Sequence, residues 1–145
     1  MSAHPRLGRV IDDQLFARLS ADPYADALGV TLEEVRPGYA RAALTVEDRH
    51  TNAHGALHGG VVVSLADVVH AAASNSHGTV AVAVEVHAEL LSTAPVGARL
   101  VCEGSEISRT RRTGLYRIEV YAGQTHVATC LGRVVRRETP ILDPE

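Results

Sequence analysis

The stretch 60–75 is apolar on nearly every side when it is placed on a helical wheel. Its residues are mostly Val, Leu, Ala and Gly, and its second half is rich in Ala. A helix without a broad polar face must be covered from most directions. We therefore predict a buried helix at 60–75, covered partly by strands of this chain and partly by a second copy of the chain, because one open sheet cannot surround it.

Alternating patterns on both sides of this helix predict strands. Residues 80–90 alternate with a period of two, which places one set of side chains on one face: Val80, Val82, Val84, Val86, Ala88 and Leu90. The predicted elements are an amphipathic helix at 10–20, a helical turn from Asp22-Pro23 to Leu28, strands at 30–35 and 39–46, a loop at 47–57, the helix, and strands at 80–90, 98–108, 114–122 and 126–136. Gly123 lies in the hairpin between the last two strands.

The length and composition predict one domain. The 145 residues suffice for a single core, so we expect one domain at 1–145, with an N-terminal helical segment at 1–28 and a flexible tail at 137–145. We expect no membrane span and, around His4, Arg6 and Arg9, no signal peptide. The two cysteines have no metal or redox spacing, which favours a cytoplasmic location. The net charge of −3 argues against a nucleic-acid partner.

Four polar side chains fall within about a third of the circumference of the predicted helix. They are Ser64, Asp67, His70 and Ser74. A carboxylate in such apolar surroundings is either paired or functional, because burying it alone costs several kcal/mol. Asp67 is therefore either a catalytic group or one half of a core pair with His70.

A second group of candidate residues lies just before the helix. It consists of Asn52, His58, Gly59 and Gly60. Two glycines at a helix start expose backbone N–H groups to which a ligand can come close, and the helix dipole favours negative charge there. This arrangement suits an oxyanion hole. Alternatively, the two glycines only ease the turn from the loop into the helix.

Together these residues form the pattern Asn-x5-His-Gly-Gly-x6-Asp, with Leu65-Ala66 before Asp67 and Asn75 at the helix end. This pattern resembles the hotdog-fold acyl-CoA thioesterases, in the branch that contains the phenylacetic acid degradation protein PaaI. The resemblance covers residues 25–136. It implies an α+β hotdog fold, in which an antiparallel sheet wraps around one long central helix. It also implies a homodimer, often paired into a homotetramer, with active sites between subunits.

The resemblance further implies a role for each matched residue. Asp67 would be the catalytic base or nucleophile, and the Gly59 N–H would polarise the thioester carbonyl. Asn52 would position the water or the thioester, and His58 would support the loop. A thioester has a good leaving group, so one carboxylate and one oxyanion donor suffice. The chain has no Gly-x-Ser-x-Gly motif for a serine nucleophile.

The chain departs from its relatives around the expected acyl site. Some relatives have Ser or Thr on the strand after the helix, where this chain has Ala81 and Ala83, and aryl-specific relatives have Phe where this chain has Val63 and His70. We expect the acyl group to contact Gly60, Val63, His70 and Ala71. Small side chains with one polar group predict a medium-length acyl chain, or an aryl group whose hydroxyl meets His70.

An arginine-rich turn precedes the strand at 114–122. Arg109, Arg111 and Arg112 give a local positive patch on an acidic protein. In the family that the chain resembles, such a loop lies near the nucleotide end of coenzyme A, and arginine binds phosphate well. The alternative is an ordinary solvated turn.

We expect no metal and no cofactor other than the coenzyme A of the substrate. His50, His54 and His58 recur at intervals of four, but the loop residues between them argue against a helical zinc motif. The function favoured by the sequence is acyl-CoA hydrolysis. Two alternatives stay open: a hotdog 3-hydroxyacyl thioester dehydratase that uses His58 and Asp67, and a module that binds acyl-CoA without turnover.

Overall fold

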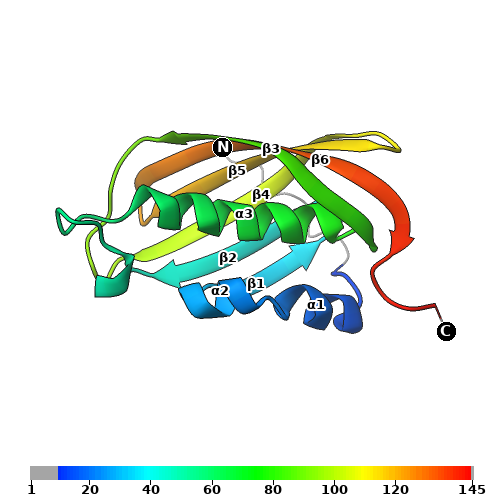
Figure 1. The fold of residues 1–145 in the computed structure, drawn as a ribbon, viewed down its shortest axis with the longest axis horizontal. Helices are drawn as coiled ribbons and strands as arrows, with labels where there is room; N and C mark the ends of the chain where they lie inside the picture. Colours follow the sequence, from blue (N-terminus) through cyan, green and yellow to red (C-terminus); the bar gives the residue numbers. More distant parts are fainter. Residues whose placement is uncertain (1–9, 145) are drawn as a thin grey trace.

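The computed structural model describes residues 10–144. These residues form one sheet, a long central helix and two shorter helices (Figure 1). The elements in chain order are α1 (Asp13–Ser20), α2 (Pro23–Leu28), β1 (Thr31–Arg36), β2 (Tyr39–Thr45), the 3-10 helix η1 (Asp48–His50), α3 (Gly59–Asn75), β3 (Thr79–Leu90), β4 (Arg99–Arg109), β5 (Thr113–Ala122) and β6 (Thr125–Pro140). Every predicted helix and strand is present, with ends shifted by a few residues.

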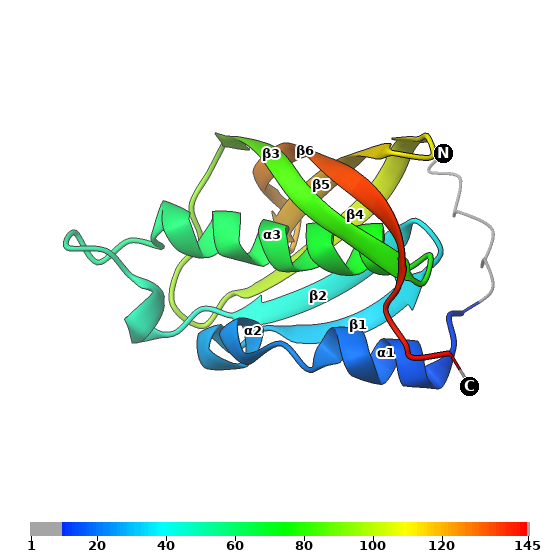
Figure 2. The same cartoon turned by 45° about the vertical axis from the view of Figure 1, so that its right-hand side comes forward.

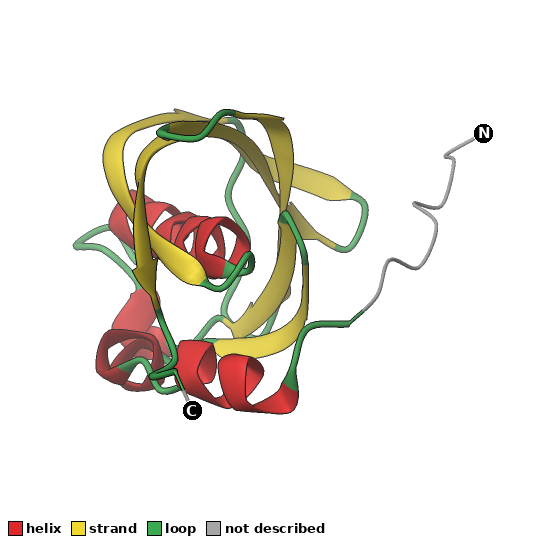
Figure 3. Ribbon diagram, turned by 90° about the vertical axis from the view of Figure 1, so that its right-hand side faces the viewer, coloured by secondary structure: helices red, strands yellow, loops and turns green. Residues whose placement is uncertain are grey.

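The sheet is antiparallel throughout, with strand order β1-β2-β4-β5-β6-β3. Seen end-on, it curls around α3 (Figure 3). The predicted α+β architecture, an antiparallel sheet wrapped around one central helix, is therefore confirmed. We call the sheet face that packs against α3 the inner face. The helices α1 and α2 lie along the β1 side of the sheet (Figure 2).

Local sequence signals explain where the helices begin. Asp12 accepts a hydrogen bond from the Gln14 N–H at 2.8 Å and so caps α1. Asp22 caps α2 in the same way, and Pro23 occupies the first turn. His58 caps α3, because its Nδ1 accepts a hydrogen bond from the Gly60 N–H at 3.1 Å.

Two glycines let α3 approach the sheet closely. A Cβ atom on Gly104 would lie 2.8 Å from Cγ1 of Val69, and one on Gly132 would lie 2.5 Å from Cε1 of His70. Neither contact is possible for a real side chain, so the close approach requires glycine at both strand positions. The layer between helix and sheet is correspondingly thin, and the buried residues are mostly Val, Ala and Leu.

The structure corrects the predicted face of β3. The pairing with β6 shifts register between Ala83 and Glu85, so Val84 is an extra residue that forms a bulge. A bulge reverses the alternation of side chains. Val82 is therefore on the outer face together with Val135, whereas Val86 pairs with Gly132 on the inner face.

The C-terminal boundary also differs from the prediction. We expected a tail from residue 137, but β6 continues to Pro140, and the Ile141 N–H donates to the Gly78 carbonyl at 2.9 Å. Ile141 and Leu142 are half-buried against the core. Of the predicted N-terminal segment 1–28, residues 1–9 lie outside the described residues, as do His4, Arg6 and Arg9, on which we based the absence of a signal peptide. Within residues 10–144, no helix combines the length and hydropathy needed to cross a membrane.

Candidate active site

Asp67 lies on the one exposed stripe of α3. Gly60, Asp67 and Ala71 are exposed and Val63 and Ser64 are half-buried, whereas most of the other helix positions are buried. No hydrogen bond or ion pair joins the Asp67 carboxylate to another residue within 10–144. The carboxylate is thus available to act on a ligand.

The alternative of a core pair between Asp67 and His70 is not formed. The His70 ring is buried, with 1% of its surface exposed, and neither ring nitrogen has a hydrogen-bond partner among the described residues. It lies over Gly132, with its centre 5.6 Å from that of the Tyr116 ring. Burial lowers the pKa of His70, against the opposing effect of the Asp67 charge, so the ring is kept neutral.

The buried neighbour of His70 is also without a partner. Tyr116 is fully buried, and its hydroxyl makes no hydrogen bond within residues 10–144. Burial raises the pKa of Tyr116 to about 12, which keeps the phenol protonated. Buried polar groups are rarely left unpaired, so His70 and Tyr116 mark a polar spot in an otherwise apolar interior.

The His58-Gly59-Gly60 segment presents one free backbone donor. The Gly60 N–H donates to His58 Nδ1, and the Val61 N–H donates to the His58 carbonyl. The Gly59 N–H has no acceptor among the described residues, which leaves it available at the positive end of the α3 dipole. A Cβ on Gly59 would be 2.8 Å from Cδ1 of Leu90, so the Leu90 side chain lies against the start of the helix.

Asn52 organises the loop that leads to this segment. Its Oδ1 accepts hydrogen bonds from the N–H groups of His54 and Ala56, at 2.9 and 3.2 Å, and its own N–H donates to the Ala56 carbonyl. His50 anchors the same loop: its Nδ1 accepts from the Glu47 N–H, so its Nε2 donates to the Leu28 carbonyl. The side-chain amide nitrogen of Asn52 is the part that stays free for a substrate within the described structure.

Within one chain, the candidate base and the candidate oxyanion donor are far apart. Asp67 follows Gly59 by eight residues, which is about 12 Å along the helix axis. Attack on one carbonyl needs both groups within a few ångströms of the substrate. The fold therefore does not join Asp67 and Gly59 of the same chain at one carbonyl.

The arginine-rich turn between β4 and β5 lies at the opposite end of the sheet from the start of α3 (Figure 1). Leu90, which contacts Gly59, pairs with Ala128, whereas the turn is fixed by Arg136, eight residues further along β6. At about 3.3 Å per residue, this separation is roughly 26 Å. The neighbouring strand β6 holds the turn in place, because Arg136 Nη1 donates a hydrogen bond to the Thr110 carbonyl at 2.6 Å.

The three arginines of this turn are exposed and differ in their partners. Arg109 Nε lies 3.4 Å from a Glu106 oxygen, and Arg111 Nη1 lies 4.0 Å from a Glu138 oxygen. The Arg112 guanidinium has no carboxylate partner within the described chain. Arg112 is thus the arginine most available to an anion.

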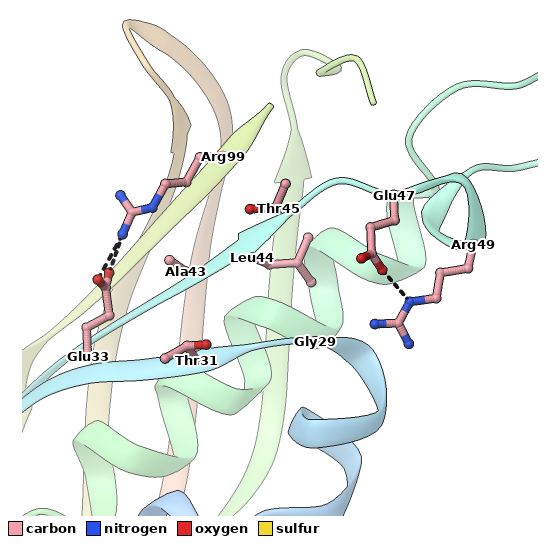
Figure 4. Close-up of a pocket in the computed structure, with 9 residues that line it drawn as sticks. All are labelled: Gly29, Thr31, Glu33, Ala43, Leu44, Thr45, Glu47, Arg49 and Arg99. Carbon is pink, nitrogen blue, oxygen red and sulfur yellow. Dashed lines mark hydrogen bonds and ion pairs between the residues drawn. The ribbon is translucent and has the colours of Figure 1, made fainter. Parts of the chain in front are cut away.

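A pocket on the outer side of β1 and β2, with a volume of about 280 Å³, contains none of the predicted site residues (Figure 4). Its charged groups neutralise one another. Arg99 Nη2 contacts both Glu33 oxygens at 2.8 Å, and Arg49 Nε contacts Glu47 Oε2 at 2.7 Å. These arginines are less free to hold an anion than Arg112.

One polar contact lies on the helix turn next to Asp67 and has no local signature in the sequence. The hydroxyl oxygens of Tyr24, in α2, and Ser64, in α3, are 2.8 Å apart. The two residues are separated by 40 positions, and no local pattern links them. The sequence showed Ser64 on the polar side of the helix, but it gave no signal for Tyr24.

Comparisons with known proteins identify the family. The family model described as "Thioesterase superfamily" matches residues 54–129. Two provisionally named esterases are similar: one from Deinococcus radiodurans is 39% identical over 135 residues (85% of this chain, 92% of that protein), and one from Archaeoglobus fulgidus is 38% identical over 99 residues (68% and 64%). This chain thus spans slightly less than two thirds of the length of the Archaeoglobus protein.

A solved structure supports the same assignment. The Escherichia coli PaaI protein from the phenylacetic acid degradation operon is 32% identical, with a TM-score of 0.83, and the match covers 88% of this chain and 93% of that one. Residues 54–129, which the family model matches, include His58-Gly59-Gly60 and Asp67. Because the family model, the relatives and the fold agree, the chain belongs to the thioesterase superfamily, as an enzyme with the hotdog fold that resembles PaaI.

Proposed function

We propose that the protein hydrolyses acyl-CoA thioesters to a free acid and coenzyme A. The observation that carries this proposal is the Asp67 carboxylate, which lies exposed on α3 and has no hydrogen-bond or ion-pair partner within residues 10–144. The relative from E. coli that is named acyl-coenzyme A thioesterase PaaI, 34% identical over 99 residues, supports acyl-CoA as the substrate class.

The mechanism follows from the two free groups of the site. Asp67 takes a proton from water as the water oxygen attacks the thioester carbon. The Gly59 N–H stabilises the negative oxygen of the tetrahedral intermediate. When the C–S bond breaks, coenzyme A leaves as a thiolate and receives the proton. Asn52 and His58 keep the loop and the helix start in place for this step, while direct attack by Asp67 is the alternative first step.

We propose that each site forms between two chains of a homodimer, which pairs into a tetramer. The distance of about 12 Å between Asp67 and Gly59 along one helix favours a site that takes Asp67 from one chain and Gly59 from the other. The edge strand β3 also leaves large apolar side chains exposed, with Val84 at 58% and Leu90 at 52%. Sedimentation velocity should show a dimer or tetramer, and an active monomer would contradict the shared site.

We propose a medium-length or hydroxylated aryl acyl group beside Gly60, Val63, His70 and Ala71. The ring nitrogens of buried His70, which have no hydrogen-bond partner among the described residues, support recognition of a hydroxyl. Because the ring lies between α3 and the sheet, the acyl group would enter the interior to reach it. We further propose that the protein acts in phenylacetate degradation and that it is located in the cytoplasm. Arg109, Arg111 and Arg112 would bind the phosphates of coenzyme A. The proposed reaction needs no metal or other cofactor.

The test is thiol release from a panel of acyl-CoAs by the wild type and by Asp67→Asn. Asparagine keeps the shape of the side chain but is not a base, so kcat should fall by more than about 100-fold. Because Asp67 is exposed and unpaired, thermal stability and coenzyme A binding should be retained. Hydration of an enoyl-CoA without thiol release would indicate a dehydratase, and binding without turnover would indicate a non-catalytic module. Either result would refute the proposal.

A further inference from the structure

We propose that Ser64, held by Tyr24, positions the water that Asp67 activates. This inference rests on the proposed hydrolysis of a thioester. Ser64 precedes Asp67 by three residues on α3, so their Cβ atoms are neighbours on one face, about 5–6 Å apart. The 2.8 Å contact between the Tyr24 and Ser64 hydroxyls links α2 to the helix turn that carries the base.

The contact with Tyr24 leaves Ser64 Oγ able to accept a further hydrogen bond. Tyr24 is 59% exposed, and Ser64 is half-buried. Either hydroxyl can donate to the other, and in both arrangements Ser64 Oγ keeps at least one lone pair as an acceptor towards the Asp67 side of the stripe. Without Tyr24, the Ser64 hydroxyl would turn back to the carbonyl of Gly60, four residues earlier in the helix.

The other polar side chains of α3 are not available for this role. Ser74 is buried and donates to the Ala71 carbonyl, and His70 is buried beneath the helix. Asn75 uses its amide on the backbone N–H and carbonyl of Ala81. Of the polar side chains of α3, Ser64 is the one that shares the exposed flank with Asp67 and retains acceptor capacity there.

A nucleophilic water has two protons to place. One proton passes to the Asp67 carboxylate, and the other must be held so that the attacking lone pair points at the thioester carbon. We assign this second hydrogen bond to Ser64 Oγ, which exchanges no proton during the reaction. Ala81 and Ala83, the third and fifth residues of β3, carry no hydroxyl.

The test compares Ser64→Ala, Ser64→Thr, Tyr24→Phe and the double variant Ser64→Ala/Tyr24→Phe on an acyl-CoA that the wild type hydrolyses. Ser64→Ala should lower kcat about 10-fold and change KM by less than about 2-fold, since the water and not the substrate loses a contact. Ser64→Thr keeps the hydroxyl and should keep most of kcat. Tyr24→Phe should lower kcat less, and the double variant should match Ser64→Ala, because the two hydroxyls act as one unit.

The matched control is Tyr121→Phe, which removes a phenolic hydroxyl from the exposed outer face and should leave kcat unchanged. An unchanged kcat in Ser64→Ala would overturn the inference. So would a loss of kcat that is equal in Ser64→Ala and Ser64→Thr, or one that follows a loss of melting temperature, because either pattern indicates a structural role. A wild type that hydrolyses no thioester refutes the proposed function instead, before any variant is compared.

Discussion

The contact between His70 and Gly132 gives a quantitative prediction for Gly132→Ala. The new Cβ would lie 2.5, 2.6 and 2.7 Å from three atoms of the His70 ring. The ring cannot swing into solvent, because it is 1% exposed and lies between α3 and the sheet with Tyr116 beside it. Either the ring or the helix must therefore move.

The size of the effect follows from the cost of overpacking. One extra methyl in a full core costs about 1–3 kcal/mol, and the contacts below 3.0 Å place this variant at the upper end of the range. For a chain of this length, each kcal/mol lowers the melting temperature by roughly 2–4 °C. We expect Gly132→Ala to melt about 6–12 °C below the wild type.

Differential scanning fluorimetry at one protein concentration measures the shift, and a double-mutant cycle assigns its cause. Removing the ring in His70→Ala should relieve the clash, so the double variant should be more stable than the sum of the two single effects by at least about 1 kcal/mol. Arg133→Ala, the next residue on the outer face, is the control and should change little. Additive effects, or a Gly132→Ala variant that melts with the wild type, would refute this account of the helix–sheet contact.

Two further predictions concern charge. Burial lowers the pKa of His70 below its ordinary value of 6.5, so the unfolded chain binds a proton at this residue more readily than the folded chain does. His70 therefore makes the stability of the fold decrease as the pH drops below about 6.5. Urea midpoints from about pH 7.5 to about pH 5 should therefore fall less steeply for His70→Phe than for the wild type, and parallel curves would contradict the effect of burial. Changing Arg109, Arg111 and Arg112 together to Ala should raise the KM for acyl-CoA and weaken the salt dependence of that KM. Turnover of a short thioester that lacks the nucleotide should stay nearly unchanged. Equal KM values of the variant and the wild type for acyl-CoA would refute the phosphate site.

Several features of the fold could be predicted because they depend on residues close together in the chain. The cap of α2 and the following proline, Asp22-Pro23, lie within one turn of each other, and so do His58, Gly59 and Gly60 at the start of α3. The long apolar helix predicted a buried helix covered in part by strands of the chain, and the resemblance to the hotdog thioesterases implied the sheet wrapped around it. The spacing from Asn52 through Gly59 to Asp67 was enough to predict the family, which the comparisons confirmed.

Other features depended on contacts between distant parts of the chain. A period of two predicts a strand, but it cannot show that Val84 is an extra residue that reverses the faces of β3, because only the partner strand β6 sets the register. The helical wheel placed Asp67 and His70 on one side, yet the position of the sheet exposes the carboxylate and buries the imidazole over Gly132. The Tyr24–Ser64 contact likewise exists only because α2 folds back onto α3. Short-range order follows from local sequence, whereas exposure, register and pairing between distant side chains follow from how the elements pack.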